Sequence, residues 1–488
     1  MMNQSNHAVK RPSPLAAALP LLVSALLAGC ANYGGIGSDK HMTDAATLVA
    51  TQSVPAEQGR WPDTDWFVQF GDPQLADLIR EALAGNPSLD RARARVVAAA
   101  AATEGANADT LPHVGADLSA TRQQYSAAAL VPPPYAGSWQ TEYRAVATAS
   151  YNLDLWGKRR EVLRASVSNE NAARAEAEQV RLTLTTALSR SYNDLARLYA
   201  LHDIADAQVA QLASIERFAR QRVATGLDTE VESRTAEARL ATARQNVKAL
   251  DGRILAIRYQ LAALLGQGPD RGLTIARPAL GAGDTVRLPD NLPVDLVSRR
   301  PDLVAARMRV EAGTHGIKVA KAEFYPDINL IAALGFDALG FGRFLTAGSR
   351  VASAGPAIHI PIFDAGALRA QLKGSYADFE TVVADYNQTL IGALSEVATE
   401  LSDIRSIDAQ LADAEQAEAA SRRALELALA QYRTGLTSQL TVWSAQLNEL
   451  STSQAVTELR MARRDRQIAL AGSLGGGYTE GGTLVASR

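Results

Sequence analysis

The stretch EYRAVATASYNLDLWGKRR, residues 142–160, changes its periodicity part of the way along. Up to Leu155, apolar and polar side chains alternate, which is the pattern of a β-strand with two different faces. Between Gly157 and Gly226 the chain contains neither glycine nor proline, and apolar residues recur at helical spacing. One helix over 158–225 would be about 100 Å long. The stretch therefore predicts a strand that leads directly into a helix too long for an ordinary globular core.

The landmarks of this stretch occur twice in the chain. Residues 87–96 match residues 301–310 at several apolar and arginine positions, beginning with a proline in each case. The turn at 224–227 likewise matches the turn at 433–436. Chance similarity between alanine-rich helices is the alternative, but it does not explain why the landmarks recur in the same order. We interpret the chain as one unit of helix, two strands, long helix, turn and return helix, duplicated once.

The repeat gives a predicted domain organisation. The first unit covers 61–270, with strands at about 112–124 and 142–156 and a helical hairpin at 157–265; a linker at 271–298 precedes the second unit at 299–472, with strands at about 326–337 and 351–363, a hairpin at 364–472, and a flexible tail at 473–488.

The N-terminus is typical of a secreted lipoprotein. Residues 1–29 have a basic start at Lys10 and Arg11, followed by a short apolar run, and are expected to be a cleaved signal peptide. The run ends in LAGC, which resembles a bacterial lipobox, and Cys30 is the only cysteine in the chain. We expect a covalent lipid on Cys30 and a flexible tether over 30–60. An ordinary signal peptide with a chance cysteine is the alternative.

The number of amphipathic strands constrains how the chain could cross a bilayer. Beyond the signal peptide there is no apolar stretch of 18 or more residues, so no transmembrane helix is expected. A mature chain that crosses a membrane must then do so as a closed barrel, because lipid cannot form hydrogen bonds with the backbone groups at an open strand edge. Four strands are fewer than the roughly eight that a barrel needs. The membrane reading thus requires several chains, whereas a soluble sheet with one wet face is the alternative.

Composition and motifs argue against other functions. The net charge is −3 and the pI about 6.1, without the basic excess of a nucleic-acid-binding protein. The six histidines are scattered, and the lone cysteine excludes a cysteine-based zinc site. No Walker loop or nucleophile elbow occurs. We therefore expect no enzyme activity, no cofactor other than the lipid on Cys30, and no nucleic-acid partner.

The chain resembles the outer-membrane efflux proteins, in the branch of lipoproteins similar to nodulation-type exporters. The segments that carry the resemblance are WFVQFGDPQL (66–75), GNPSL (85–89), LDLWGKRR (153–160), RRPDL (299–303), Tyr325-Pro326 and PIFDAG (361–366). The resemblance implies an α+β membrane protein: a homotrimer with a twelve-stranded β-barrel and a periplasmic helical barrel of long hairpins. It also implies a passive outer-membrane channel for drugs or other toxic small molecules, with an adaptor protein and an RND-type inner-membrane pump as partners. A lipid-anchored periplasmic scaffold or adaptor is the alternative.

The resemblance also suggests functional residues. Gly226, Leu227, Gly435 and Leu436 would lie at the periplasmic tip, where the adaptor docks. Tyr432 and Glu232 correspond to positions that close the tip in family members, although ordinary helix-end residues would look the same. Thr441 and Ser444 occupy positions that are often acidic in the family, which puts a carboxylate ring there in doubt.

Overall fold

The computed structural model describes residues 33–50, 52–55, 59–128, 131–281, 288 and 292–481. Two compact units divide these residues. The sheet unit contains the described residues up to 42, with 97–171 and 307–385, and the hairpin unit contains the remainder. The predicted signal peptide at 1–29 and the lipid site at Cys30 lie outside the described residues, so both stay predictions.

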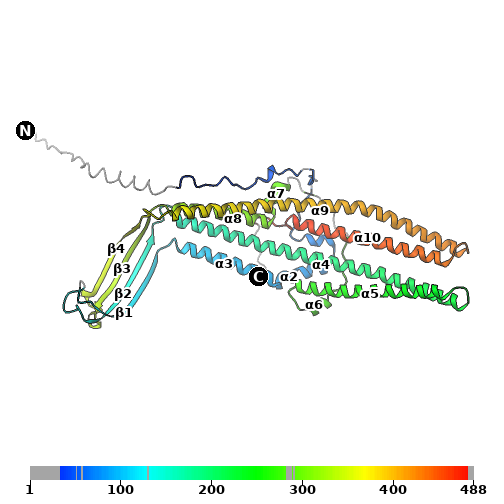
Figure 1. Ribbon diagram of the computed structural model, residues 1–488, viewed down its shortest axis with the longest axis horizontal. Helices are drawn as coiled ribbons and strands as arrows, with labels where there is room; N and C mark the ends of the chain where they lie inside the picture. Colours follow the sequence, from blue (N-terminus) through cyan, green and yellow to red (C-terminus); the bar gives the residue numbers. More distant parts are fainter. Residues whose placement is uncertain are drawn as a thin grey trace, which may run out of the picture. The chain divides into compact units, whose positions relative to one another are not determined.

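The elements follow the predicted order twice (Figure 1). They are η1 (Ala45–Thr47), η2 (Trp66–Phe70), α2 (Pro73–Gly85), α3 (Pro87–Ala108), β1 (His113–Gln124), β2 (Trp139–Asn152), α4 (Lys158–Ala224), α5 (Glu230–Leu264), α6 (Pro269–Leu273), α7 (Leu292–Arg299), α8 (Pro301–Ala322), β3 (Asp327–Leu339), η3 (Phe341–Arg343), η4 (Ala347–Ser349), β4 (Arg350–His359), α9 (Ala367–Arg433) and α10 (Gln439–Ser473). The duplicated α+β organisation is therefore confirmed.

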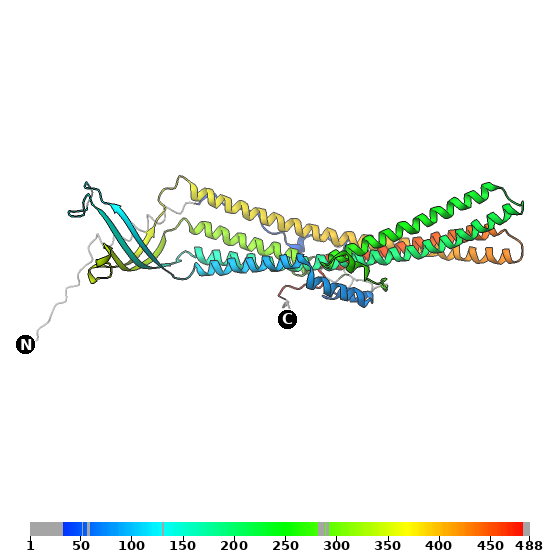
Figure 2. The same cartoon turned by 90° about the horizontal axis from the view of Figure 1, so that it is seen from below.

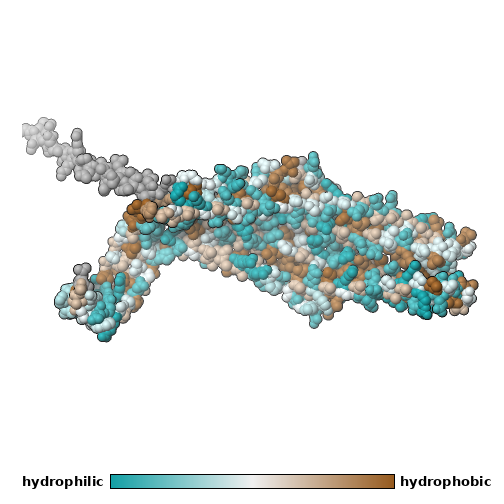
Figure 3. Space-filling model, in the orientation of Figure 1, coloured by the Kyte–Doolittle hydropathy of each residue, from teal (hydrophilic) through white to brown (hydrophobic). Residues whose placement is uncertain are grey.

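The four strands form one antiparallel sheet in the order β1-β2-β3-β4. The register places Ala116 opposite Ala147, and Ala147 opposite Leu334, so one face is apolar. Ser119 and its partner Arg144 belong to the other, polar face. In Figure 3, hydrophilic side chains gather at the loop end of the sheet, and more apolar ones cover the strands toward their other end.

The predicted bounds of two strands were wrong by several residues. The strand expected at 142–156 runs from Trp139 to Asn152, because residues 139–141 already pair with β1 and Asp154 turns the backbone into α4. The strand expected at 351–363 ends at His359. Pro361 lacks an N–H to continue the ladder, and Asp364 caps the next helix. Polar and apolar side chains continue to alternate beyond the last residue of both strands, so the pattern predicted strand ends that lie too far along the chain.

The helical hairpins are nearly identical in length. The long helices α4 and α9 have 67 residues each, and the return helices α5 and α10 have 35 each. Gly226 and Gly435 end the long helices in the left-handed conformation, with φ of 72° and 78°. Thr229 and Ser438 cap the return helices through their hydroxyl oxygens. Figures 1 and 2 both show the two turns at the same end of the hairpin unit.

Within the described ranges, no helix combines the length and the apolar character that crossing a membrane requires.

The core of the hairpin unit lies where α2 and the surrounding segments pack on the middle of α4. Fully buried side chains there include Leu75 and Ile79 from α2, Leu188 and Tyr192 from α4, and Leu261 from α5. Each of these helices buries one face, and burial of such a side chain contributes about 1.5–3 kcal/mol.

The terminal segments predicted to be a flexible tether and tail are packed where they are described. The ring of Tyr33 lies edge-on to Phe324 at 5.7 Å in the sheet unit. In the hairpin unit, the Thr43 amide donates to Asn387 Oδ1 at 2.7 Å. Leu474 is buried, and the backbone at Gly475 lies directly against the Arg299 carbonyl. Contacts with residues distant in sequence, which local composition does not encode, hold both segments in place.

Candidate functional site: the strand–helix junction and the hairpin turns

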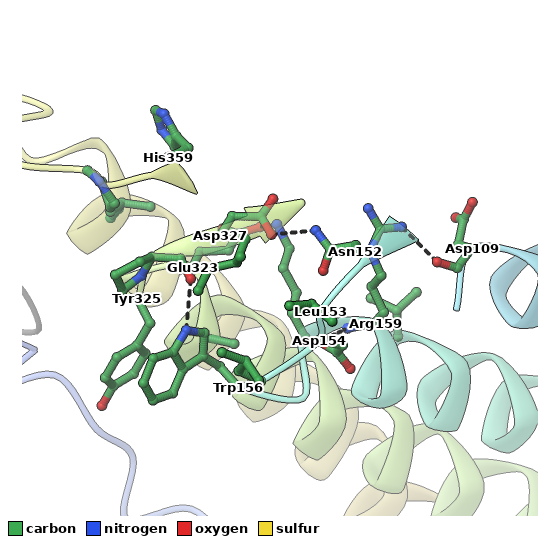
Figure 4. Close-up of a pocket in the computed structure, with 18 of the residues that line it drawn as sticks. Asp109, Asn152, Leu153, Asp154, Trp156, Arg159, Glu323, Tyr325, Asp327 and His359 are labelled. Carbon is green, nitrogen blue, oxygen red and sulfur yellow. Dashed lines mark hydrogen bonds and ion pairs between the residues drawn. The ribbon is translucent and has the colours of Figure 1, made fainter. Parts of the chain in front are cut away.

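A pocket of about 580 Å³ lies in the sheet unit where the strands meet the helices (Figure 4). Both repeats line it, through the end of β2, the start of β3 and the starts of α4 and α9. Asn152 Nδ2 donates to Asp327 Oδ1 at 2.5 Å across the two repeats. Lys158 Nζ lies 3.0 Å from Glu323 Oε1. Polar contacts between the repeats thus surround the pocket.

Trp156 is the aromatic centre of this junction. Its indole N–H donates to the Pro326 carbonyl at 2.8 Å, and its ring stacks on Tyr325 at 4.7 Å. Trp156 nevertheless remains 46% exposed. An amphipathic ring of this kind suits a membrane–water boundary, where one side is apolar and the other wet.

An aspartate starts the long helix in each repeat. The Asp154 carboxylate accepts from the Arg159 and Arg160 amides at 3.0 Å each. The Asp364 carboxylate accepts from the Gly366 and Leu368 amides at 3.0 and 2.7 Å. Burial works against ionisation of Asp154, but these donors outweigh it and lower its pKa. The backbone donors likewise lower the pKa of Asp364.

A part-buried hydrogen bond between a histidine and a glutamate joins α8 to α4 beside the junction. His315 Nδ1 lies 2.5 Å from Glu161 Oε2, and Lys318 lies 3.7 Å from the same oxygen. Burial raises the pKa of Glu161, but the His315 hydrogen bond and the charges of Lys318 and Arg164 outweigh it, so the pKa is lowered overall. This pair could not be predicted from sequence patterns, because its two members are far apart in the chain.

Asp72 joins three segments of the hairpin unit. One carboxylate oxygen caps α2 by accepting from the Gln74 amide at 3.0 Å. The other accepts from the buried Tyr192 hydroxyl and from the Ala279 amide, both at 2.7 Å. The predicted linker at 271–298 is therefore fastened to α2 and α4.

Arg300 plays a similar part at the start of the second repeat. Its guanidinium donates to Glu396 at 2.7 Å, to the Ser473 carbonyl at 2.9 Å, and to Asp302 at 2.7 and 3.1 Å. Burial lowers the pKa of Arg300, but Asp302 and Glu396 outweigh it and raise the pKa. Arg300 thus links the start of α8 to the middle of α9 and to the last residue of α10.

The hairpin turns present exposed apolar side chains. Leu227 is 65% exposed and Leu436 is 80% exposed, so each turn carries an apolar side chain that is open to solvent. Below the turns, Phe218 packs edge-on against Trp443 at 5.0 Å, so α4 and α10 are in contact. The predicted tip residues are therefore accessible on a supported surface.

The two gate candidates each have a partner within their own hairpin. The Tyr432 hydroxyl donates to Gln439 Oε1 at 3.1 Å. Glu232 accepts from the Thr229 hydroxyl, and this bond is the main cause of its lowered pKa. Direct contact between Tyr432 and Glu232 stays a prediction.

Among the residues the structure describes, no group of three or more His, Cys, Asp or Glu side chains is placed to hold a metal ion.

A family model, that of the outer membrane efflux proteins, matches residues 78–267 and 292–476. The chain therefore belongs to the outer membrane efflux protein family, and it is an outer-membrane efflux channel protein. This confirms the resemblance and the location predicted from the sequence.

Individual relatives agree with this assignment. The fusaric acid resistance protein FusA of Burkholderia cepacia is 37% identical over 366 residues, covering 73% of this chain and 68% of that protein. The multidrug resistance outer membrane protein MdtP of Shigella flexneri is 30% identical over 465 residues, covering 93% of this chain and 94% of its own. The solved outer membrane protein VceC of Vibrio cholerae has a TM-score of 0.79 at 33% identity, covering 86% of this chain and 100% of that one. The outer-membrane channel OprN has a TM-score of 0.80 at 30% identity, covering 91% and 99%.

Proposed function

We propose that three copies of this chain form the exit duct of a tripartite efflux system. The three sheets join edge to edge into a twelve-stranded barrel, and the hairpins form a helical barrel in the periplasm. The duct conducts passively. An inner-membrane pump of the RND type drives transport, and a periplasmic adaptor joins the pump to the duct.

The free edges of the sheet are the observation that carries this proposal. Among the residues that the structure describes, β1 is bonded only to β2, and β4 only to β3. Each unpaired backbone group in lipid costs several kcal/mol. Because β1 and β4 run antiparallel, β4 of one copy can continue the ladder on β1 of the next. Repeating this step in a ring removes every edge.

The cargo and the anchor follow from separate observations. The relatives are named for multidrug and fusaric acid resistance, so we infer that small toxic organic compounds pass through the duct. Cleavage after residue 29 and lipidation of Cys30 would hold the N-terminus at the membrane as a tether. The exposed Leu227 and Leu436 provide the apolar surface on which the adaptor docks.

Cross-linking tests the edge-to-edge assembly. Ser119 in β1 would be replaced by cysteine and combined, one at a time, with cysteines at positions 351–357 in β4. Oxidation should yield covalent trimers for one register, and the purified trimer should conduct ions in a planar bilayer. A matched series with the β1 cysteine moved to β2 at Thr148 should yield none. Monomers throughout, soluble once the lipid is removed, would instead support the scaffold alternative.

Conductance also tests the gate. Replacing Tyr432 by Phe and Glu232 by Gln should raise the open fraction of the reconstituted channel, because each change removes a polar partner at the tip. Tyr259→Phe, at an exposed position of α5, is the matched control and should conduct like the wild type. Unchanged conductance in the double variant would remove both residues from the gate.

A further inference from the structure

The loop end of the sheet carries an aromatic cluster. Tyr143 of β2 lies 5.4 Å from Phe341 and 5.9 Å from Phe344, measured between ring centroids. Phe336 of β3 lies 6.4 Å from Phe344. Phe341 is still 71% exposed, as is Leu345 at 72%. The cluster is therefore an ordered apolar surface that the described chain leaves uncovered.

The register assigns this cluster to the apolar face of the sheet. Tyr143 and Phe336 alternate in phase with Ala145 and Leu334, not with Arg144 and Asp337 of the polar face. In the proposed duct the apolar face contacts lipid, so the cluster lies in the outer leaflet, where aromatic side chains gather in barrels.

Two arginines flank the cluster. Arg350 is the register partner of Phe336 and therefore belongs to the same face. Arg343 lies between Phe341 and Phe344 in sequence, and among the described residues its guanidinium donates to the Tyr135 hydroxyl, at 3.5 Å. Both arginines are exposed, and within the described ranges no carboxylate forms an ion pair with either. Residues 125–138 and 340–350 contain these two charged residues and no acidic one.

We propose that Arg343, Arg350 and the aromatic cluster bind a phosphate-bearing lipid of the outer leaflet, a phosphorylated glycolipid such as lipid A. Guanidinium groups bind phosphate through paired hydrogen bonds, and the rings and Leu334 receive the acyl chains. A free phosphate ion would cover only the cationic half of this surface. A ligand with an anionic head and apolar chains covers both halves. The proposal rests on the membrane-spanning role of the sheet proposed above.

Native mass spectrometry of the full-length protein in detergent tests the proposal. The probes are diphosphoryl lipid A, the same lipid without phosphates, and inorganic phosphate as competitor. We expect the wild type to bind the phosphorylated lipid at least about tenfold more tightly than the dephosphorylated one, since a hydrogen bond to a charged group is worth about that factor. The Arg343→Gln/Arg350→Gln variant should lose this preference. Arg144→Gln, on the opposite face of the same sheet, should keep it.

Three outcomes would overturn the proposal: equal binding of the two lipids by the wild type, an unchanged preference in the double variant, or displacement of the lipid by inorganic phosphate at equal concentration. Trimer content and planar-bilayer conductance would be measured on the same samples. A conducting trimer without lipid preference refutes the lipid site alone. A monomer without conductance refutes the proposed duct, which separates the two failures.

Discussion

Replacing Asp72 by Ala should destabilise the hairpin unit far more than a single lost hydrogen bond would suggest. The substitution removes the cap of α2, which is worth about 1 kcal/mol. It also removes the acceptor of the buried Tyr192 hydroxyl and of the Ala279 amide. Loss of the Tyr192 bond costs about 1–3 kcal/mol, and loss of the more exposed Ala279 bond about 1 kcal/mol. The expected total is about 3–5 kcal/mol.

Tyr192→Phe provides the comparison. It removes two hydrogen bonds of the Tyr192 hydroxyl. The bond donated to Asp72 is worth about 1.5–3 kcal/mol and the one accepted from the Gln74 side-chain amide about 0.5–1.5 kcal/mol, while Asp72 keeps its two backbone donors. Because the two residues share one contact, the double variant should lose less stability than the sum of the single variants, by about 1–2 kcal/mol.

Guanidinium unfolding of the detergent-purified protein, followed by tryptophan fluorescence, measures these differences, and Trp66 lies in the affected core. Tryptic cleavage at Arg277, close to Ala279 in the linker, should accelerate in the Asp72→Ala variant. Strict additivity of the two single variants in the double variant would refute the reasoning.

Other predictions concern the sheet unit and the glycines. Hydrogen bonds from the α4 amides outweigh burial and hold the pKa of Asp154 below its ordinary 3.8. The stability that Asp154 contributes is therefore complete above pH 3.8 and is lost as the pH falls through the lowered pKa. Acid unfolding of Asp154→Asn should show a shallower pH dependence in that range. Gly335→Ala should impair assembly of heat-stable oligomers, because the new Cβ would lie 2.1 Å from a carbonyl oxygen of β2. Gly348→Ala, outside the strands, has open space around the new Cβ and should assemble normally on semi-native gels. Gly475→Ala combines a φ of 90° with a Cβ position 1.9 Å from a carbonyl oxygen. It should lower the unfolding midpoint by clearly more than Gly226→Ala, because the latter adds only backbone strain of about 1 kcal/mol.

The order of the strands and helices could be predicted from the sequence, because the spacing of apolar residues differs between the two kinds of element. The absence of glycine and proline over 158–225 indicates a helix of that length, and the repeated landmarks indicate the second copy. The strand ends were less predictable. Alternation continues past Asn152 and His359, and the side chains that end these strands, Asp154 and Asp364, act through turns that alternation does not show.

The site was predicted less completely than the fold. Motifs drew attention to Asp154, Trp156 and Arg300, but their partners lie on segments far away in the chain, and only the fold brings them together. Asp154 lies four residues before the first residue of α4, whereas Asp364 lies three residues before the first residue of α9, yet each caps its helix. Such a shift is compatible with duplication, because the first turn of the helix needs an acceptor for its amides but the position of the residue that supplies it can vary.

The matched helix lengths restrict how this gene can change by insertion and deletion. The two long helices have the same number of residues, as do the two return helices. Four extra residues in α4 alone would advance its turn by about 6 Å and rotate the following side chains by some 40°. The return helix would then meet its partner out of register. Viable length variants therefore carry compensating changes in all four helices, and they come in steps of about seven residues, which restore the packing faces.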